Sequence, residues 1–154
     1  MRLSQLLTKN RVILDLQAQT KDEAIDELLQ SLMNSGEVKN PVEFVKSVEA
    51  REKLESTGIG SGVAIPHGIT DAVRSVVCTM GISKRGIDFG ALDGKSVHFI
   101  FLLGIPKGEA REYLSLLAHI CRLFRDEEWR RQITHLASVD RLIELIIERE
   151  MTIS

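Results

Sequence analysis

The four histidines and the one tyrosine of this sequence are its main candidates for acid–base or nucleophilic chemistry. Among them, His67 lies between Pro66, which restricts the backbone before it, and Gly68, which allows another group to approach closely. A neutral imidazole is a nucleophile, and an ordinary histidine pKa near ~6.5 leaves a neutral fraction at cellular pH. These residues predict a covalent role for His67, and they leave open the alternative of a surface histidine in a turn.

A glycine-rich segment, residues 55–62, comes shortly before His67 and is predicted to be a loop. Its third glycine is one position early for the dinucleotide-binding pattern GxGxxG, and no GxxxxGK(S/T) motif occurs. The loop does offer flexible backbone, N–H groups and hydroxyls that can turn toward an anion. Its candidate phosphate-binding residues are Ser56, Thr57, Gly58 and Gly60, and the alternative is a plain connecting loop.

Arg51 is a further candidate, because the guanidinium fork of arginine matches the geometry of a phosphate group. It lies 16 positions before His67 on a predicted helix. The structural alternative for Arg51 is an ion pair with Glu55, four positions further along the same helix.

The other histidines have better structural explanations. His98 lies among apolar residues of a predicted strand, His119 is expected to be solvated on the polar side of a helix, and His135 is near a helix end. Because no HxH, HExxH or CxxC pattern occurs, no metal site is predicted. Glu148 and Glu150 are predicted to be ordinary surface carboxylates of the last helix.

The composition is that of an ordinary globular protein, with 154 residues, 44% hydrophobic and 27% charged, and a net charge of −2. The near-neutral charge argues against a nucleic-acid partner. The longest apolar run, residues 97–105, is too short for insertion into a bilayer, which takes ~20 residues. The N-terminus lacks the apolar core of a signal peptide, so we expect a cytoplasmic location and one domain over residues 1–154.

Apolar spacing and helix caps predict the elements that must position these side chains. The expected strands are 11–16, 63–65, 73–83 and 97–105, and the expected helices are 20–32, 41–54, 109–124, 126–136 and one that begins at Ser138. One strand, two helices, three strands and three helices predict an α/β (α+β) chain with helices on both faces of a sheet. The predicted architecture is a three-layer α/β/α sandwich.

Three segments together resemble a known family. Arg51-Glu52-Lys53, Ser56-Thr57-Gly58-Ile59-Gly60 and Ala64-Ile65-Pro66-His67-Gly68 are similar to the enzyme IIA domain of the bacterial sugar phosphotransferase system, in its fructose, mannitol and nitrogen-regulatory class (type 2). The resemblance covers nearly the whole chain. It implies a mixed sheet between helices, a phosphoryl acceptor at His67 and a stabilising role for Arg51.

Tyr113 departs from that family's pattern. The family usually has a second histidine that begins a helical HLxxLA segment, and here the segment is Tyr113-Leu114-Ser115-Leu116-Leu117-Ala118. His119 cannot replace that histidine, because six residues at ~100° each place it about 240° further round the helix. A tyrosine hydroxyl can hydrogen-bond a phosphoryl oxygen but cannot become a cation. The alternative for Tyr113 is an amphipathic residue at the core edge.

The leading hypothesis is a phosphoryl carrier that needs no cofactor. The resemblance implies that His67 accepts phosphate from the phosphocarrier HPr or an HPr-like protein, then passes it to a IIB domain or uses it as a regulatory signal. The alternative is a regulatory binding module that controls a transporter, kinase or transcription factor by protein contact, and Tyr113 motivates it.

Overall fold

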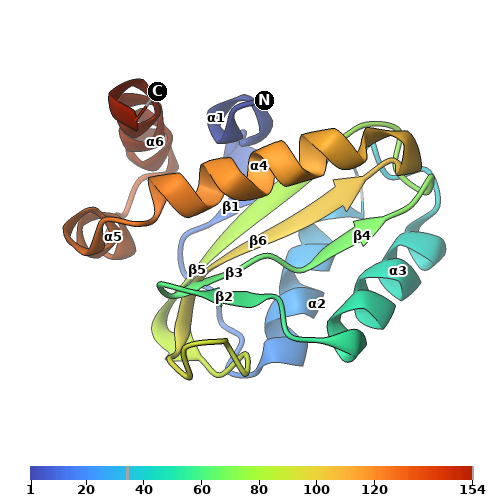
Figure 1. Ribbon diagram of the computed structural model, residues 1–154, viewed down its shortest axis with the longest axis horizontal. Coiled ribbons are helices and arrows are strands. Elements are labelled where there is room, and N and C mark those ends of the chain that lie inside the picture. The colour runs from blue at the N-terminus through green and yellow to red at the C-terminus, as the bar shows by residue number, and fades with distance from the viewer. Residues whose placement is uncertain (34, 154) are drawn as a thin grey trace.

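The structure is a computed structural model, and it describes residues 1–33 and 35–153. The helices and strands follow the chain in the order shown in Figure 1: α1 (Leu3–Leu6), the 3-10 helix η1 (Lys9–Arg11), β1 (Val12–Ile13), α2 (Lys21–Leu32), α3 (Pro41–Leu54), β2 (Gly58–Gly60), β3 (Val63–Ala64), β4 (His67–Ile69), β5 (Val77–Ile87), β6 (Val97–Ile105), the 3-10 helix η2 (Lys107–Glu109), α4 (Ala110–Leu123), α5 (Glu127–Thr134) and α6 (Val139–Ile153).

The strands of the described residues form one mixed sheet in the order β1-β5-β6-β3-β2, and β4 also pairs with β6. The long strands β5 and β6 are antiparallel, whereas β1 pairs with β5, and β3 and β4 pair with β6, in parallel. β3 and β4 therefore run along the same side of β6, and the chain between them is interrupted at Pro66. This interruption places His67 at the start of β4.

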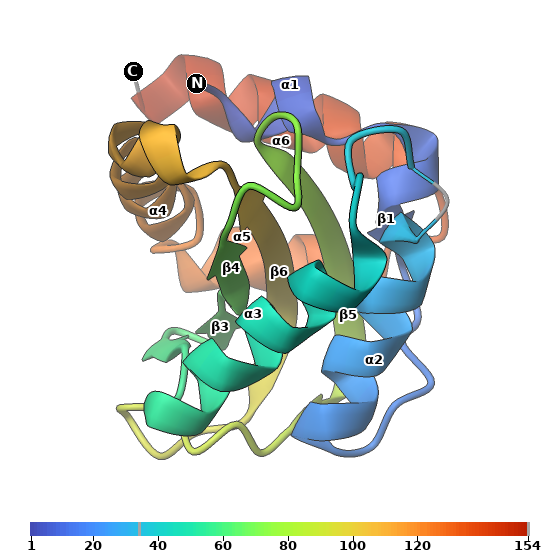
Figure 2. The same ribbon diagram turned by 90° about the vertical axis from the view of Figure 1, so that its right-hand side faces the viewer.

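Helices cover both faces of this sheet, because the side chains of β6 alternate between two apolar clusters. Phe99, Phe101 and Leu103 pack in the cluster that includes α1, α4, α5 and α6. Ile100 and Leu102 pack in the cluster that includes α2 and α3. Figures 1 and 2 show these two groups of helices on opposite sides of the sheet. The predicted three-layer arrangement is confirmed.

Side-chain caps fix the beginnings of the helices that the sequence predicts. The Thr20 side chain accepts a hydrogen bond from the Glu23 N–H at 3.2 Å before α2. The Asn40 side chain accepts one from the Glu43 N–H at 3.2 Å, and Pro41 is the first residue of α3. Each cap satisfies an N–H group that has no partner inside its own helix, so both predicted starts are confirmed.

The strand ends differ from the expected ones, because pairing with neighbouring strands rather than apolar composition sets them. β5 begins at Val77 instead of residue 73 and continues to Ile87, which pairs with Val97 beyond an irregularity in the register. β1 is shorter than the expected 11–16. The expected loop 55–62 contains the short strand β2, and residues 67–69, which were expected to lie between strands, form β4. Helix α1 was not predicted.

The expectation that His119 and Glu150 are solvated is wrong. Glu150 is only 2% exposed, and its carboxylate lies 2.7 Å from the His119 Nε2 atom. The same carboxylate accepts hydrogen bonds from the Ser4 backbone N–H at 3.3 Å and from the Ser4 hydroxyl. The network joins α1, α4 and α6. Glu150 is therefore an internal acceptor, a role that its place near the chain end did not indicate.

Among the described residues, no helix has both the length and the apolar character needed to cross a membrane.

Candidate active site

His67 is fixed by the strand that it begins. It pairs with Leu103 of β6, and only 5% of the residue is exposed. The next residue, Gly68, packs against α3 so closely that a Cβ atom there would lie 2.8 Å from the Ser47 Oγ atom. Glycine is thus required for α3 to approach β4, and this close approach brings the last turn of α3 toward His67.

The hydrogen bond of the His67 ring selects one tautomer. The Nδ1 atom lies 2.9 Å from the Ile65 carbonyl oxygen. Because a carbonyl oxygen can only accept, Nδ1 must carry the hydrogen, and Nε2 is left with its lone pair. Burial lowers the pKa of His67, and the Arg51 charge lowers it further, against opposing effects of the Ile65 hydrogen bond and Glu52. The imidazole is therefore a neutral nucleophile at Nε2.

The low pKa of His67 gives a direct prediction. Because burial disfavours the charged ring, protonation should require a lower pH than the ordinary midpoint of about 6.5, and Nε2 should stay free at neutral pH. NMR titration of the ring Cε1–H signal measures the midpoint, with an unstructured peptide of residues 63–71 as reference. A midpoint equal to or above that of the peptide would contradict the argument.

Tyr113, from the first turn of α4, packs on the His67 ring. The two ring centroids are 4.6 Å apart and the ring planes are inclined by 33°. Burial raises the pKa of the Tyr113 hydroxyl, although the Arg51 charge lowers it, so this group stays a neutral donor at physiological pH. The helix thus contributes an aromatic cover and a hydroxyl beside the nucleophile.

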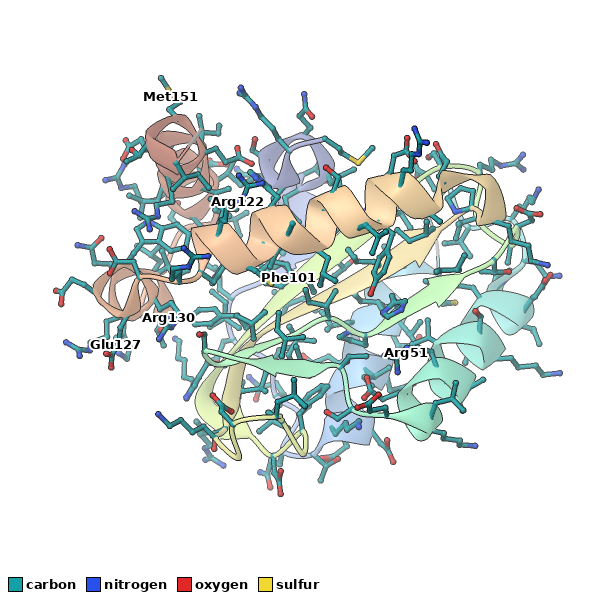
Figure 3. The ribbon with its side chains drawn as sticks, viewed as in Figure 1. Arg51, Phe101, Arg122, Glu127, Arg130 and Met151 are labelled. Atoms are coloured by element: carbon teal, nitrogen blue, oxygen red, sulfur yellow. The ribbon has the colours of Figure 1, made fainter. Side chains whose placement is uncertain are left out.

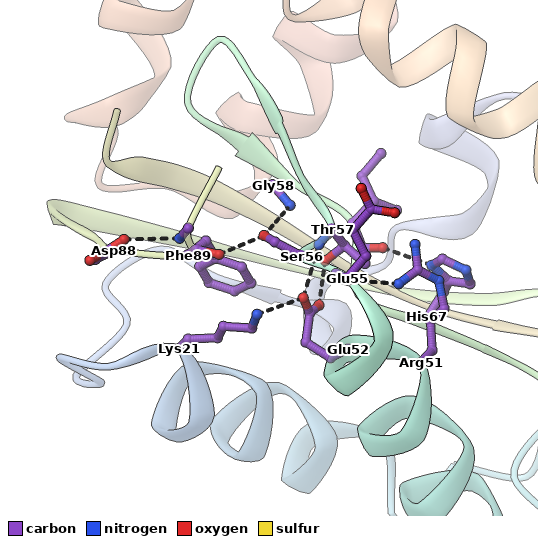
Figure 4. Close-up of polar contacts among 12 residues, drawn as sticks. Lys21, Arg51, Glu52, Glu55, Ser56, Thr57, Gly58, His67, Asp88 and Phe89 are labelled. Atoms are coloured by element: carbon purple, nitrogen blue, oxygen red, sulfur yellow. Dashed lines mark hydrogen bonds and ion pairs between the residues drawn. The ribbon is translucent and has the colours of Figure 1, made fainter. Parts of the chain in front are cut away.

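Arg51 lies in the last turn of α3, and its guanidinium group is close to the His67 ring in Figure 4. Its Nη1 atom donates a hydrogen bond to the Glu55 backbone carbonyl at 2.7 Å, which satisfies an acceptor at the end of the helix. The partner is this carbonyl and not the Glu55 carboxylate that the alternative prediction named. The guanidinium group retains further N–H donors for a ligand.

Glu52 organises the segment beside Arg51, and the sequence did not indicate this role. Its buried carboxylate accepts hydrogen bonds from the Thr57 N–H at 2.9 Å and from the Thr57 hydroxyl, and it lies 2.7 Å from the Lys21 ammonium group (Figure 4). The available signal was its position between Arg51 and Lys53 in the first similar segment. The network fixes the start of β2 relative to α2 and α3.

The hydroxyl groups of Ser56 and Thr57 in the glycine-rich segment have partners inside the protein. The Ser56 hydroxyl donates to the Phe89 carbonyl and accepts from the Gly58 N–H at 3.0 Å. Gly58 has no room for a side chain, because a Cβ atom would lie 2.9 Å from the Ala91 Cα atom. Gly60 has a positive φ of 99° at the β2–β3 turn. Phosphate binding by this segment stays a prediction.

The described residues contain no group of three or more His, Cys, Asp and Glu side chains that could hold a metal ion. The structure thus brings His67 and Tyr113 together, with Arg51 beside them, and the arrangement combines a neutral nucleophile with a cation. These are the groups that transfer of an anionic phosphoryl group requires.

A match to a known family model identifies the family of this chain. Residues 5–149 match the family model described as phosphoenolpyruvate-dependent sugar phosphotransferase system, EIIA 2. The chain belongs to this family. EIIA type 2 proteins are phosphoryl carriers, so the predicted family and its general function are confirmed.

Both transport and regulatory proteins are among the EIIA relatives. The chain is 32% identical over 150 residues to the fructose-specific EIIABC component of Bacillus subtilis, with 97% of this chain and 24% of that protein covered. It thus spans about a quarter of that relative. It is also 26% identical to the nitrogen regulatory protein of Pseudomonas aeruginosa, with 96% of each chain covered.

Solved EIIA structures share the fold. The nitrogen regulatory protein IIA-Ntr from Neisseria meningitidis has a TM-score of 0.85 at 27% identity, and 94% of this chain and 98% of that one are covered. The IIA mannitol enzyme of Escherichia coli, in complex with phosphorylated IIB, has a TM-score of 0.79 at 26% identity, with coverages of 92% and 97%. The likeness thus extends over almost all of this chain.

Proposed function

We propose that His67 accepts a phosphoryl group at Nε2 from HPr or an HPr-like protein and passes it to a IIB-type acceptor. The observation that carries this proposal is the hydrogen bond from Nδ1–H to the Ile65 carbonyl, which leaves Nε2 as the nucleophilic atom. Phosphoenolpyruvate, the ultimate donor in the family description, is a cytoplasmic metabolite. The proposal therefore places the chain in the cytoplasm.

The transfer is a displacement at phosphorus. The Nε2 lone pair forms the new N–P bond while the N–P bond of the donor phosphohistidine breaks, and its electron pair returns to the donor nitrogen. The Nδ1 proton stays between the ring and the Ile65 carbonyl, so the positive charge that develops on the ring has an acceptor beside it. Arg51 stabilises the negative charge on the phosphoryl oxygens.

The glycine-rich segment has a positioning role in this proposal. Glu52 and Thr57 hold the segment in place, and Ser56 binds the neighbouring Phe89 carbonyl. These contacts fix the chain on both sides of Glu55, whose carbonyl holds Arg51. The segment therefore supports the guanidinium position, in addition to any N–H group that it offers to the phosphate.

Exposed apolar residues support a protein partner for this site. Arg51, His67 and Tyr113 are each followed within three positions by an exposed apolar residue, namely Leu54 at 82%, Ile69 at 40% and Leu114 at 61% exposure. Exposed apolar side chains next to a reactive group favour contact with another protein. The Escherichia coli relative in complex with phosphorylated IIB is consistent with an acceptor of that kind.

A regulatory binding module is the second candidate function. Full-length coverage of the Pseudomonas aeruginosa nitrogen regulatory protein favours it, as does Tyr113 in place of the usual second histidine. In that case the partner would bind regardless of the phosphorylation state of His67. Binding of a captured partner by wild-type protein and by His67→Asp protein, compared at equal concentration, separates the two candidates.

The relay is tested by reconstitution. The chain is mixed with phosphoenolpyruvate, enzyme I and HPr, and the expected product is an acid-labile phosphoprotein that carries one phosphoryl group. Addition of a IIB domain should then remove the label from this chain. Absence of label with a donor that phosphorylates a control EIIA protein would contradict the proposal.

Tyr113→Phe tests the hydroxyl beside the nucleophile. The ring contact is retained, so the free energy of unfolding should change by less than about 1 kcal/mol, whereas loss of one hydrogen bond to the phosphoryl group should slow transfer about tenfold. Tyr113→His should restore most of the rate. Stopped-flow or quench-flow labelling measures the rates, and an unchanged rate in Tyr113→Phe would show that the hydroxyl has no part.

A further inference from the structure

A cavity of about 530 Å³ lies at the other end of β6 from Leu103, the residue that pairs with His67. Its lining includes four cationic side chains, a histidine and a serine: Lys84, Lys95, Arg130, Arg131, His98 and Ser61. His98 lies five positions along β6 from Leu103, the partner of His67, which is a distance of roughly 16 Å. The cavity is therefore separate from the phosphoryl-transfer site, and its volume is within the range of small-molecule sites, ~300–1,000 Å³.

The cations come from opposite walls of the cavity. Lys84 belongs to the end of β5, and Lys95 to the connection between β5 and β6. Arg130 and Arg131 belong to α5, and Figure 3 places Arg130 between α5 and the tip of the β2–β3 hairpin. Two walls of positive charge with a space between them suit a ligand that has two separate anionic groups.

The carboxylates of this cavity do not neutralise its lysines. Asp93 accepts hydrogen bonds from the backbone N–H groups of Ser61 at 3.2 Å and Lys95 at 3.1 Å. On the α5 wall, Arg131 pairs with Glu127 at 3.3 Å and Glu128 at 3.5 Å, and the Arg130 Nη1 atom donates to the Arg125 carbonyl at 3.0 Å and to the Phe124 carbonyl. Each guanidinium group has five N–H donors, so donors remain for a ligand. Within residues 1–33 and 35–153, neither the Lys84 nor the Lys95 ammonium group lies within 4.0 Å of a carboxylate. The two lysines thus bring positive charge to the cavity without an ion pair, whereas Arg131 has carboxylate partners.

His98 and Ser61 add hydrogen-bonding groups. The His98 Nδ1 atom lies 2.8 Å from the Ser83 carbonyl, so Nδ1 carries the hydrogen and Nε2 is available for a ligand. Ser61 has a positive φ of 56° between two positive-φ glycines. Glycine would adopt this backbone conformation at lower cost in free energy. Serine instead places an exposed hydroxyl group at the cavity.

We propose that this cavity binds a small phosphorylated metabolite with two separate phosphate groups. Lys84 and Lys95 would bind one phosphate, and Arg130 and Arg131 the other. Because the cavity shares no residue with the site at His67, this binding does not depend on the proposed phosphoryl transfer, and either can fail without the other.

The test uses fructose 1,6-bisphosphate as the probe, with inorganic pyrophosphate and uncharged fructose for comparison. Titration of ¹⁵N-labelled protein should give saturable NMR shifts at the amides of Ser61, Lys95, Ser96 and Thr134 with the bisphosphate. Pyrophosphate should bind more weakly because its phosphates are too close to reach both walls, and fructose should not bind. Affinity should fall as ionic strength rises.

A charge-matched pair of variants makes the test specific. The double variant Lys84→Gln/Lys95→Gln should weaken bisphosphate binding about tenfold or more, because two charge-assisted contacts are lost. Lys39→Gln/Lys46→Gln removes the same charge from exposed residues outside the cavity and should leave the affinity unchanged. Both variants should keep wild-type phosphoryl acceptance. Shifts elsewhere, equal weakening in both variants, or no saturation would overturn the proposal.

Discussion

His67→Ala is expected to abolish phosphoryl acceptance, with the rate at least ~10³-fold below that of the wild type, because alanine has no atom that can form the N–P bond. The ring is buried and packs against Tyr113, so its removal also leaves a void and an unsatisfied Ile65 carbonyl. Loss of labelling by alanine alone could therefore have a structural cause.

His67→Asn separates the two causes. Its side-chain amide can donate to the Ile65 carbonyl in place of Nδ1–H, but it supplies no nucleophile. Circular dichroism should show a folded protein with a free energy of unfolding closer to the wild type than that of the alanine variant. Labelling should be absent in both, and it should persist in His135→Ala, which removes an exposed histidine that follows α5. Labelling of the folded asparagine variant would refute the assignment of His67.

Arg51→Ala is expected to slow phosphoryl transfer by about 10²–10³-fold without preventing it, because the nucleophile remains while a cation beside the transferring charge is lost. Its hydrogen bond to the Glu55 carbonyl contributes about 1 kcal/mol to the free energy of unfolding, so the fold should persist. Arg51→Lys should give an intermediate rate, since lysine keeps the charge and loses the planar fork.

Lys53→Ala is the matched control for this prediction. It removes one positive charge from the same last turn of α3, and its side chain is exposed. Single-turnover labelling measures both variants, and Lys53→Ala should stay within about twofold of the wild type, as expected for a screened surface charge. If Arg51→Ala and Lys53→Ala slowed phosphoryl transfer equally, the cause would be the effect of net charge on docking of the donor protein, and the proposed role of Arg51 would be wrong.

Local signals predicted much of the fold. Thr20 and Asn40 specify helix starts through side-chain bonds to residues three positions away, so the sequence alone was sufficient. The ends of β5 and the strand β4 depend on pairing with β6, which a local pattern does not contain. The three-layer order was predictable because alternation along β6 exposes apolar residues on both faces.

The residue types of the candidate site could be predicted from the sequence. The roles of carboxylates that depend on burial could not. His67 and Arg51 were identified from chemistry and motif, and the structure places them beside each other. Glu150 was predicted to be an ordinary surface carboxylate, and no role was predicted for Glu52, because residue type alone does not show that Thr57 and His119 donate to them. Long-range packing decides whether a carboxylate is solvated or is an internal acceptor.

In the proposed transfer to His67, the Ile65 carbonyl also affects the lifetime of the phosphorylated form. A phosphohistidine whose ring keeps its second proton has a good leaving group, and one whose ring loses that proton holds the phosphoryl group for longer. By holding the Nδ1 proton, the carbonyl keeps the group easy to release to the next acceptor. Since this acceptor is a main-chain atom, no side-chain substitution at position 65 removes it, and we expect the backbone to limit how long a phosphoryl group stays on His67.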